Sequence, residues 1–125
     1  MGQKHIFIVD DNEMFAEMLR DHLSQNPAYK ISVFNTGEDC LRNLYQNPDL
    51  ILLDFYLNDK FKDAANGLKI LEEIKKQKSR AHIIMLSSQE RYAVAAQTIS
   101  KGAEQYVIKD KDTFNNIGKI LRSIF

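Results

Sequence analysis

Four short apolar runs of this sequence each end in a polar residue that could take part in chemistry. Asp10 and Asp11 follow residues 5–9, Asp54 follows 50–53, Ser87 follows 83–86, and Lys109 follows 106–108. Three carboxylates from two such runs would suit a hard divalent cation such as Mg²⁺, which prefers oxygen ligands. A carboxylate beside a bound cation can also act as a nucleophile and form an aspartyl phosphate. Lys109 could then offset the charge of the phosphoryl group, and Ser87 could donate a hydrogen bond to it.

Each of these residues also has an ordinary structural explanation when it is taken alone. Asp10 and Asp11 could cap the helix that follows them, where acidic side chains are favoured. Asp54 could simply end a strand in a turn, Ser87 could cap a helix, and Lys109 could be a solvated surface lysine. Their joint placement after separate apolar runs favours a common site.

The apolar runs alternate with segments of helical spacing five times along the chain. Predicted strands cover residues 5–9, 30–34, 50–54, 81–86 and 104–108, and predicted helices include 12–24, 89–100 and a last one from about 112. Such short alternating units require parallel strands with right-handed crossovers, which gives a three-layer α/β sandwich. The carboxyl ends of parallel strands lie along one edge, where ligands bind. We therefore expect the polar strand ends to converge.

The spacing also predicts which side chains share an apolar helix face. These are Met14, Met18 and Leu19 in the first helix, and Leu41, Leu44 and Tyr45 in the second. The second helix opens at residues 36–39, a segment that resembles a capping box. Cys40 is expected in the core.

Composition limits the classes of function. A chain of 125 residues fits one domain, so we expect residues 1–125 to form a single unit. The formal net charge of zero gives no support for general attraction to nucleic acid or to an anionic membrane. Cys40 is the only cysteine, which excludes an internal disulfide and favours a reduced, cytoplasmic setting. The sequence has no signal-peptide pattern and no run long enough to span a membrane.

Four segments resemble the motifs of one family, in order and across the whole chain. Val9-Asp10-Asp11-Asn12, Leu53-Asp54, residues 85–88 (MLSS) and residues 102–109 (GAEQYVIK) are similar to the receiver domain of two-component response regulators. The resemblance implies a flavodoxin-like, doubly wound (βα)5 fold whose parallel sheet has the strand order 2-1-3-4-5.

The resemblance also implies a role for each residue at the strand ends. Asp54 would accept a phosphoryl group from a histidine on a sensor histidine kinase or a histidine phosphotransfer protein. Asp10 and Asp11 would be the acid pair that holds Mg²⁺. Ligand chemistry alone already allows Asp11 and Asp54 as direct ligands, with a main-chain carbonyl near Tyr56, and Asp10 acting through water. Lys109 would contact the phosphoryl group. The domain would catalyse only its own phosphorylation and dephosphorylation.

Ser87 and Tyr106 match the two switch positions of the family. Tyr106 would turn inward when Ser87 moves toward the phosphoryl group, and the fourth helix, fifth strand and fifth helix would report the change. That face would control a downstream protein or a C-terminal output domain, for example a DNA-binding one, and could form a dimer. The receiver itself would contact neither nucleic acid nor membrane.

The chain departs from the family pattern in two places. Residues 55–57 (FYL) replace the usual Met-Pro turn after Asp54, and an insertion at residues 58–65 delays Asn66-Gly67. Tyr56 and Gln89 hold positions that modulate dephosphorylation in the family, and the Tyr56 ring could hinder the attacking water. Asp110 replaces the proline that follows Lys109. Because a non-proline cis bond costs about 2.5–4 kcal/mol, we expect a trans or a strained peptide there.

Two further functions compete with the signalling switch. An aspartate-nucleophile phosphohydrolase of the haloacid-dehalogenase type would usually carry Asp-x-Asp, whereas Asp54-Phe55-Tyr56 lacks the second acid. A degenerate receiver that serves only for docking would lack some of the chemical residues, but all five positions are filled. The sequence does not distinguish a stand-alone receiver from the N-terminal part of a longer regulator.

Overall fold

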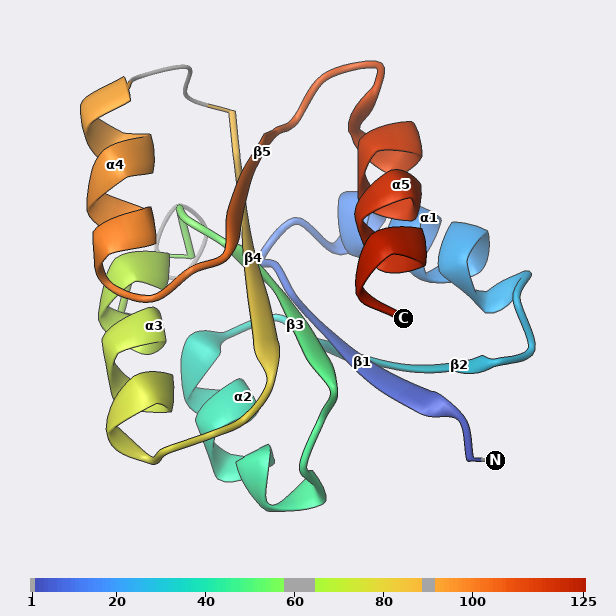
Figure 1. The fold of residues 1–125 in the computed structure, drawn as a ribbon, viewed down its shortest axis with the longest axis horizontal. Helices are drawn as coiled ribbons and strands as arrows, with labels where there is room; N and C mark the ends of the chain where they lie inside the picture. Colours follow the sequence, from blue (N-terminus) through green and yellow to red (C-terminus); the bar gives the residue numbers. More distant parts are fainter. Residues whose placement is uncertain (1, 58–64, 89–91) are drawn as a thin grey trace.

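Five parallel strands form one sheet in the computed structural model, which describes residues 2–57, 65–88 and 92–125. The strands are β1 (Lys4–Val9), β2 (Tyr29–Phe34), β3 (Leu50–Asp54), β4 (His82–Ser87) and β5 (Gln105–Ile108). Their spatial order is β2-β1-β3-β4-β5, so the predicted flavodoxin-like order is confirmed (Figure 1). The winding direction reverses between β1 and β3, which is where such sheets bind ligands.

Helices cover both faces of the sheet and make the predicted three layers. α1 (Glu13–Ser24) and α5 (Thr113–Ile124) lie on one face, and α2 (Gly37–Arg42), α3 (Gly67–Lys76) and α4 (Tyr92–Ser100) lie on the other (Figure 1). Among the described residues, none of these helices has the length and apolarity needed to cross a bilayer. The start predicted for the fourth helix, residues 89–91, lies outside the described residues.

The core consists of two apolar clusters, one on each side of the sheet, with β3 buried on both faces. The residues from Leu50 to Leu53 are all fully buried, as expected for a central parallel strand. In β1, Ile6 and Ile8 belong to the cluster under α1 and α5, whereas Phe7 and Val9 belong to the cluster under α2 and α3. Both faces of β1 are therefore covered, and the ends of the strands are the part of the sheet where a ligand can bind.

The expected apolar face of α1 is confirmed at Leu19 and wrong at Met14 and Met18. Met14 and Met18 are 75% and 55% exposed, and the buried side chains are Ala16, Leu19 and Leu23. The small Ala16 side chain lets the helix approach the sheet closely, so the stripe that starts at Ala16 makes the packing contact. The methionine stripe faces away from that contact.

The second predicted helix begins as expected and ends early. The Thr36 side chain accepts a hydrogen bond from the Asp39 N–H at 3.2 Å, which confirms the cap. α2 stops at Arg42, and a 3-10 helix (Leu44–Gln46) follows it. The Tyr45 side chain is therefore 75% exposed instead of sharing the core face.

Cys40 is fully buried, as predicted. Burial raises the pKa of its thiol to about 12, so the thiol stays protonated at neutral pH.

Candidate phosphoacceptor and metal site

Three acidic side chains lie together at the carboxyl ends of β1 and β3. Val9 pairs with Leu53 across these strands, so Asp10 follows β1 beside Asp54 at the end of β3. Asp10, Asp11 and Asp54 are 0%, 5% and 4% exposed. One carboxylate oxygen from each lies within 4.8 Å of the others. The predicted convergence of these three carboxylates is present in the structure.

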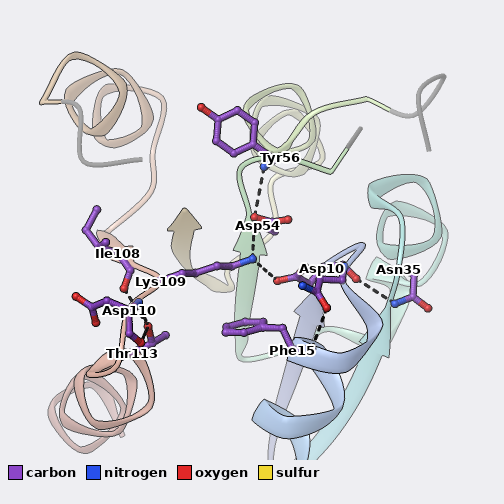
Figure 2. A network of polar contacts seen from close by, with 10 residues as sticks. Asp10, Phe15, Asn35, Asp54, Tyr56, Ile108, Lys109, Asp110 and Thr113 are labelled. Carbon is purple, nitrogen blue, oxygen red and sulfur yellow. Dashed lines mark hydrogen bonds and ion pairs between the residues drawn. The ribbon is translucent and has the colours of Figure 1, made fainter. Parts of the chain in front are cut away.

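Lys109 crosses the site from the end of β5 and contacts two of the three acids (Figure 2). Its Nζ lies 2.8 Å from Asp10 Oδ2 and 3.2 Å from Asp54 Oδ1. The Lys109 side chain is 19% exposed, which excludes the alternative of a solvated surface lysine. The ammonium offsets part of the negative charge that the buried carboxylates bring together.

Burial and neighbouring charges shift the pKa values of Asp54 and Lys109. Burial is the main cause that raises the pKa of Asp54 to about 7, and the neighbouring Asp10 raises it further. Lys109 and the hydrogen bond from the Tyr56 N–H oppose this rise. For Lys109, burial alone would lower the pKa, but the charges and hydrogen bonds of Asp54 and Asp10 outweigh it and raise the pKa. The ammonium is therefore held in its charged form.

The helix cap near the site is Asn12 rather than either aspartate. The Asn12 side chain accepts a hydrogen bond from the Phe15 N–H at 3.1 Å. Asp10 Oδ1 accepts from the Asn12 N–H at 2.9 Å, and the Asn35 side chain donates to the Asp10 carbonyl at 3.0 Å. These bonds fix the backbone around Asp10. Neither Asn35 nor this role of Asn12 was predicted from the sequence.

A cavity of about 620 Å³ opens over the acids. Asp11, Asp54, Tyr56 and Lys109 line it, together with Met14 and other residues at the start of α1. The Tyr56 N–H donates to Asp54 Oδ1 at 3.4 Å, a long hydrogen bond. The Tyr56 ring packs edge-on against Phe55, with ring centroids 4.9 Å apart. The acids therefore line a cavity large enough for a small anionic group.

The two predicted switch residues lie in neighbouring strands. Ser87 ends β4 and is fully buried, and Tyr106 of β5 pairs with Met85. Burial raises the pKa of the Tyr106 phenol, whereas a hydrogen bond with the Ser87 side chain lowers it. The nearby Tyr56 also raises it. The structure thus brings Ser87 and Tyr106 into contact, as their proposed coupling requires.

The segment after Lys109 is trans, since the described residues contain no cis peptide. The Thr113 hydroxyl accepts from the Asp110 N–H at 2.6 Å and donates to the Ile108 carbonyl at 3.0 Å (Figure 2). Thr113 thereby holds the turn between β5 and α5 without a proline.

Two further predictions concern segments outside the described residues. They are the effect of the insertion, of which residues 58–64 are not described, and the role of Gln89.

The comparisons with known proteins agree with this geometry. The family model described as "Response regulator receiver domain" matches residues 6–121. Transcriptional regulatory protein MalR of Bacillus subtilis is 31% identical over 107 residues, which are 84% of this chain and 43% of MalR. Transcriptional regulatory protein DcuR of Escherichia coli is 28% identical, over 84% of this chain and 44% of DcuR. The chain thus spans less than half the length of these relatives.

Solved structures show the same fold. The crystal structure of response regulator protein TrrA from Thermotoga maritima, in complex with Mg(2+)-BeF, superposes with a TM-score of 0.81 at 27% identity. The superposition covers 98% of this chain and 100% of TrrA. The strand order, the acidic strand ends and the match over residues 6–121 lead to one conclusion. The chain belongs to the receiver domain family of two-component response regulators.

Proposed function

We propose that Asp54 is the phosphoacceptor of this receiver and that its donor is a phosphohistidine on a sensor histidine kinase or a histidine phosphotransfer protein. One observation carries the proposal. The Lys109 ammonium lies 3.2 Å from the Asp54 carboxylate inside a cluster of buried acids. Such a carboxylate beside a fixed cation is a suitable nucleophile for phosphorus.

In the proposed reaction, an oxygen of the Asp54 carboxylate attacks phosphorus. The new P–O bond forms as the P–N bond to the donor imidazole breaks, and the electron pair leaves with the imidazole nitrogen. Lys109 moves toward the phosphoryl oxygens and offsets their charge. Hydrolysis of the acyl phosphate later returns the Asp54 carboxylate and inorganic phosphate. We propose no other reaction for the domain.

The acidic cluster fits Mg²⁺, because three buried carboxylates offer hard oxygen atoms close together. Asp11 and Asp54 are the proposed direct ligands, with the Tyr56 main-chain carbonyl, and Asp10 acts through water. When bound, the cation would screen the repulsion between carboxylate and phosphoryl oxygens. The Mg(2+)-BeF complex of TrrA supports this assignment.

The proposed switch runs from Ser87 to Tyr106. A phosphoryl group on Asp54 offers new acceptor oxygens near the end of β4, where Ser87 lies. If Ser87 turns toward them, its contact with Tyr106 changes. Because Tyr106 also packs against the core cluster under α3, this change biases the face formed by α4, β5 and α5.

The output of this switch is proposed to be protein-based. MalR and DcuR are named as transcriptional regulatory proteins, and the chain matches less than half of each. We therefore propose that the α4, β5 and α5 face controls either an output domain, with DNA binding as the first candidate, or a separate cytoplasmic partner. A phosphorylation-dependent dimer through the same face is part of this proposal.

The competing phosphohydrolase function has less support. Tyr56 stands where that class needs its second acid, and the chain belongs to a different family. Incubation with small phosphomonoesters tests it directly, since a receiver would not turn them over.

The proposed function is tested by incubating the protein with Mg²⁺ and acetyl phosphate and measuring the intact mass. We expect the mass of one added phosphoryl group in the wild type and in Asp21→Asn, which changes an exposed carboxylate on α1. Asp54→Asn should show no gain. A gain that survives Asp54→Asn, or no gain with either acetyl phosphate or a histidine kinase, contradicts the proposal.

A further inference from the structure

The Lys109 ammonium lies over the face of the Phe15 ring, with Nζ 4.4 Å from the ring centroid (Figure 2). Phe15 belongs to the first turn of α1, and Lys109 follows β5, so the two meet only in the folded protein. The N–H of Phe15 is bonded to the capping side chain of Asn12. This bond fixes the Phe15 backbone at the start of the helix, directly after Asp10 and Asp11.

The other two partners of this ammonium are carboxylate oxygens that the proposed chemistry also needs. Lys109 Nζ contacts Asp10 Oδ2 at 2.8 Å and Asp54 Oδ1 at 3.2 Å. A divalent cation in the cluster would draw on both carboxylates, on Asp54 directly and on Asp10 through water. Phosphorylation then ties one Asp54 oxygen into the acyl phosphate, which removes the negative charge of the carboxylate. The hold of these two carboxylates on the lysine is therefore weakened when the lysine has to meet the phosphoryl group.

A free lysine side chain has a flexible four-carbon stem and a strongly hydrated head group. Without another contact, the side chain would sample many conformations, in several of which the ammonium would be hydrated by solvent. Among the described residues, the Phe15 ring face is the one recorded contact of the ammonium that takes no part in the proposed metal or phosphoryl site.

We propose that Phe15 is a positioning residue for Lys109. Its ring holds the ammonium over the cavity by a cation–π contact while the cation and the phosphoryl group take over the carboxylate oxygens. This inference rests on the proposed function of Asp54 and adds to it the group that keeps its cationic partner in place.

An aromatic ring suits this task for two physical reasons. It is neutral, so it neither binds Mg²⁺ nor adds charge to the acidic cluster. Its attraction for an ammonium is modest beside that of a carboxylate. The lysine can therefore move along the ring face toward phosphoryl oxygens without having to break a strong attraction to the ring.

The alternative explanation is that the Phe15 side chain serves only to pack the interior. Its side chain is half-buried against the core cluster under α1 and α5, and its ring packs on Phe114 with centroids 6.0 Å apart. The two explanations differ in one respect. Packing depends on the shape of the ring, whereas the hold on Lys109 depends on the negative charge of its face.

Site-specific incorporation of trifluorophenylalanine separates them, because fluorine withdraws charge from the ring face and nearly preserves its shape. With trifluorophenylalanine at position 15, we expect the apparent affinity for beryllofluoride at saturating Mg²⁺ to fall by about three- to tenfold. The melting temperature should stay near that of the wild type. The same replacement at Phe114, whose ring contacts are with Phe15 and His22, is the matched control and should leave the affinity unchanged.

Ordinary variants extend the test. Phe15→Tyr keeps a ring face and should bind beryllofluoride like the wild type, whereas Phe15→Leu should lose affinity with Mg²⁺ binding retained. Equal affinity of the trifluorophenylalanine variant at position 15 and the wild type overturns the positioning role.

NMR supplies a readout that does not depend on activity. The methylene protons next to the Lys109 ammonium should show an upfield ring-current shift in the metal-free protein and again with Mg²⁺ and beryllofluoride. If the wild type loses this shift when it binds Mg²⁺ and beryllofluoride, the positioning role of Phe15 is overturned, but the proposed function of Asp54 is not. A wild type that neither binds beryllofluoride nor accepts a phosphoryl group at Asp54 overturns the proposed function, and the positioning role with it.

Discussion

Gly67 lies against the backbone of Asp54, the proposed acceptor residue. A Cβ atom on Gly67 would stand 2.2 Å from the Asp54 carbonyl oxygen and 2.8 Å from the Cα of Phe55. The Gly67 N–H also donates to the Phe55 carbonyl at 2.8 Å. The start of α3 is therefore fixed directly behind the acceptor, in spite of the long connection at residues 58–66. Only glycine allows this approach, because the atoms in the way belong to the backbone.

Gly67→Ala should therefore disturb the site as well as the fold. Forcing a methyl group into a close-packed contact costs typically about 1–3 kcal/mol and sometimes more. We expect that loss in the free energy of unfolding measured with urea, together with weaker Mg²⁺ binding, because Asp54 has to shift.

Gly118→Ala is the control for this change. The nearest atom to a Cβ there is the mobile end of Arg122, at 3.3 Å, and Gly118 lies inside α5. The helix should gain up to about 1 kcal/mol from the substitution. An unfolding curve of Gly67→Ala that matches the wild type would contradict the close approach.

The buried carboxylate of Asp54, the proposed acceptor, should make the metal-free protein less stable as pH rises. The folded-state pKa of Asp54 is about 7, above its ordinary value of 3.8. A carboxyl whose pKa is raised by folding stabilises the folded state below the ordinary pKa, and this contribution is lost as pH rises through the folded pKa. The difference between 3.8 and about 7 corresponds to at most about 4 kcal/mol.

Asp54→Asn should consequently be more stable than the wild type at pH 8 without metal. The gain in the free energy of unfolding should approach about 4 kcal/mol at pH 8 and vanish below about pH 4. Urea titrations at several pH values measure it. Asp21→Asn should show no such trend, since that carboxylate is exposed. A difference between Asp54→Asn and the wild type that is constant with pH would rule out Asp54 as its source.

The site residues could be predicted from the sequence because each one ends a strand. In a parallel sheet, a strand end has only one edge on which to lie, so Asp10, Asp54, Ser87 and Lys109 had to converge once the five strands were identified. The register of β4 and β5 then determines which residues lie side by side at this edge. Ser87 pairs with Ile108, which places Lys109 one residue beyond it.

Contacts between helices and strand ends could not be predicted in the same way. The spacing of α1 offers two overlapping stripes, and the small Ala16 decides which one packs, so Met14 and Met18 were placed wrongly. The position of Phe15 under Lys109 depends on how closely α1 approaches the end of β5. Helical periodicity carries no information about that distance.

Lys109 and Mg²⁺ should compete for the carboxylate oxygens of the acidic cluster. The ammonium contacts Asp10 and Asp54, two of the three carboxylates that would hold the cation. Lys109→Met removes the charge and keeps an extended apolar side chain. We expect Mg²⁺ to bind about tenfold more tightly, the effect of about 1.4 kcal/mol of relieved repulsion, while phosphorylation by acetyl phosphate slows.

Isothermal titration with Mg²⁺ measures the first effect and intact mass over time the second. Lys119→Met, which removes an exposed lysine charge on α5, should change neither. Mg²⁺ affinity that is unchanged or lower in Lys109→Met would mean that the ammonium does not share the oxygens of the cation.

The Tyr56 ring should lengthen the life of the phosphoryl group. Tyr56 lines the cavity over Asp54 and packs on Phe55, and we expect its bulk to narrow the approach of a water to the acyl phosphate. Tyr56→Ala opens that path. A barrier lower by about 1 kcal/mol would shorten the half-life of phosphorylated Asp54 by about fivefold.

Following the loss of the phosphorylated form by intact mass, after the donor is removed, gives this half-life. Tyr56→Phe keeps the bulk without the hydroxyl and should behave like the wild type, which separates hindrance from hydrogen bonding. Tyr45→Ala, at a 75% exposed tyrosine outside the site, controls for the loss of a surface ring. If the half-life in Tyr56→Ala equals that of the wild type, the ring does not hinder the water. If it shortens in Tyr56→Phe as well, the hydroxyl rather than the bulk protects the acyl phosphate.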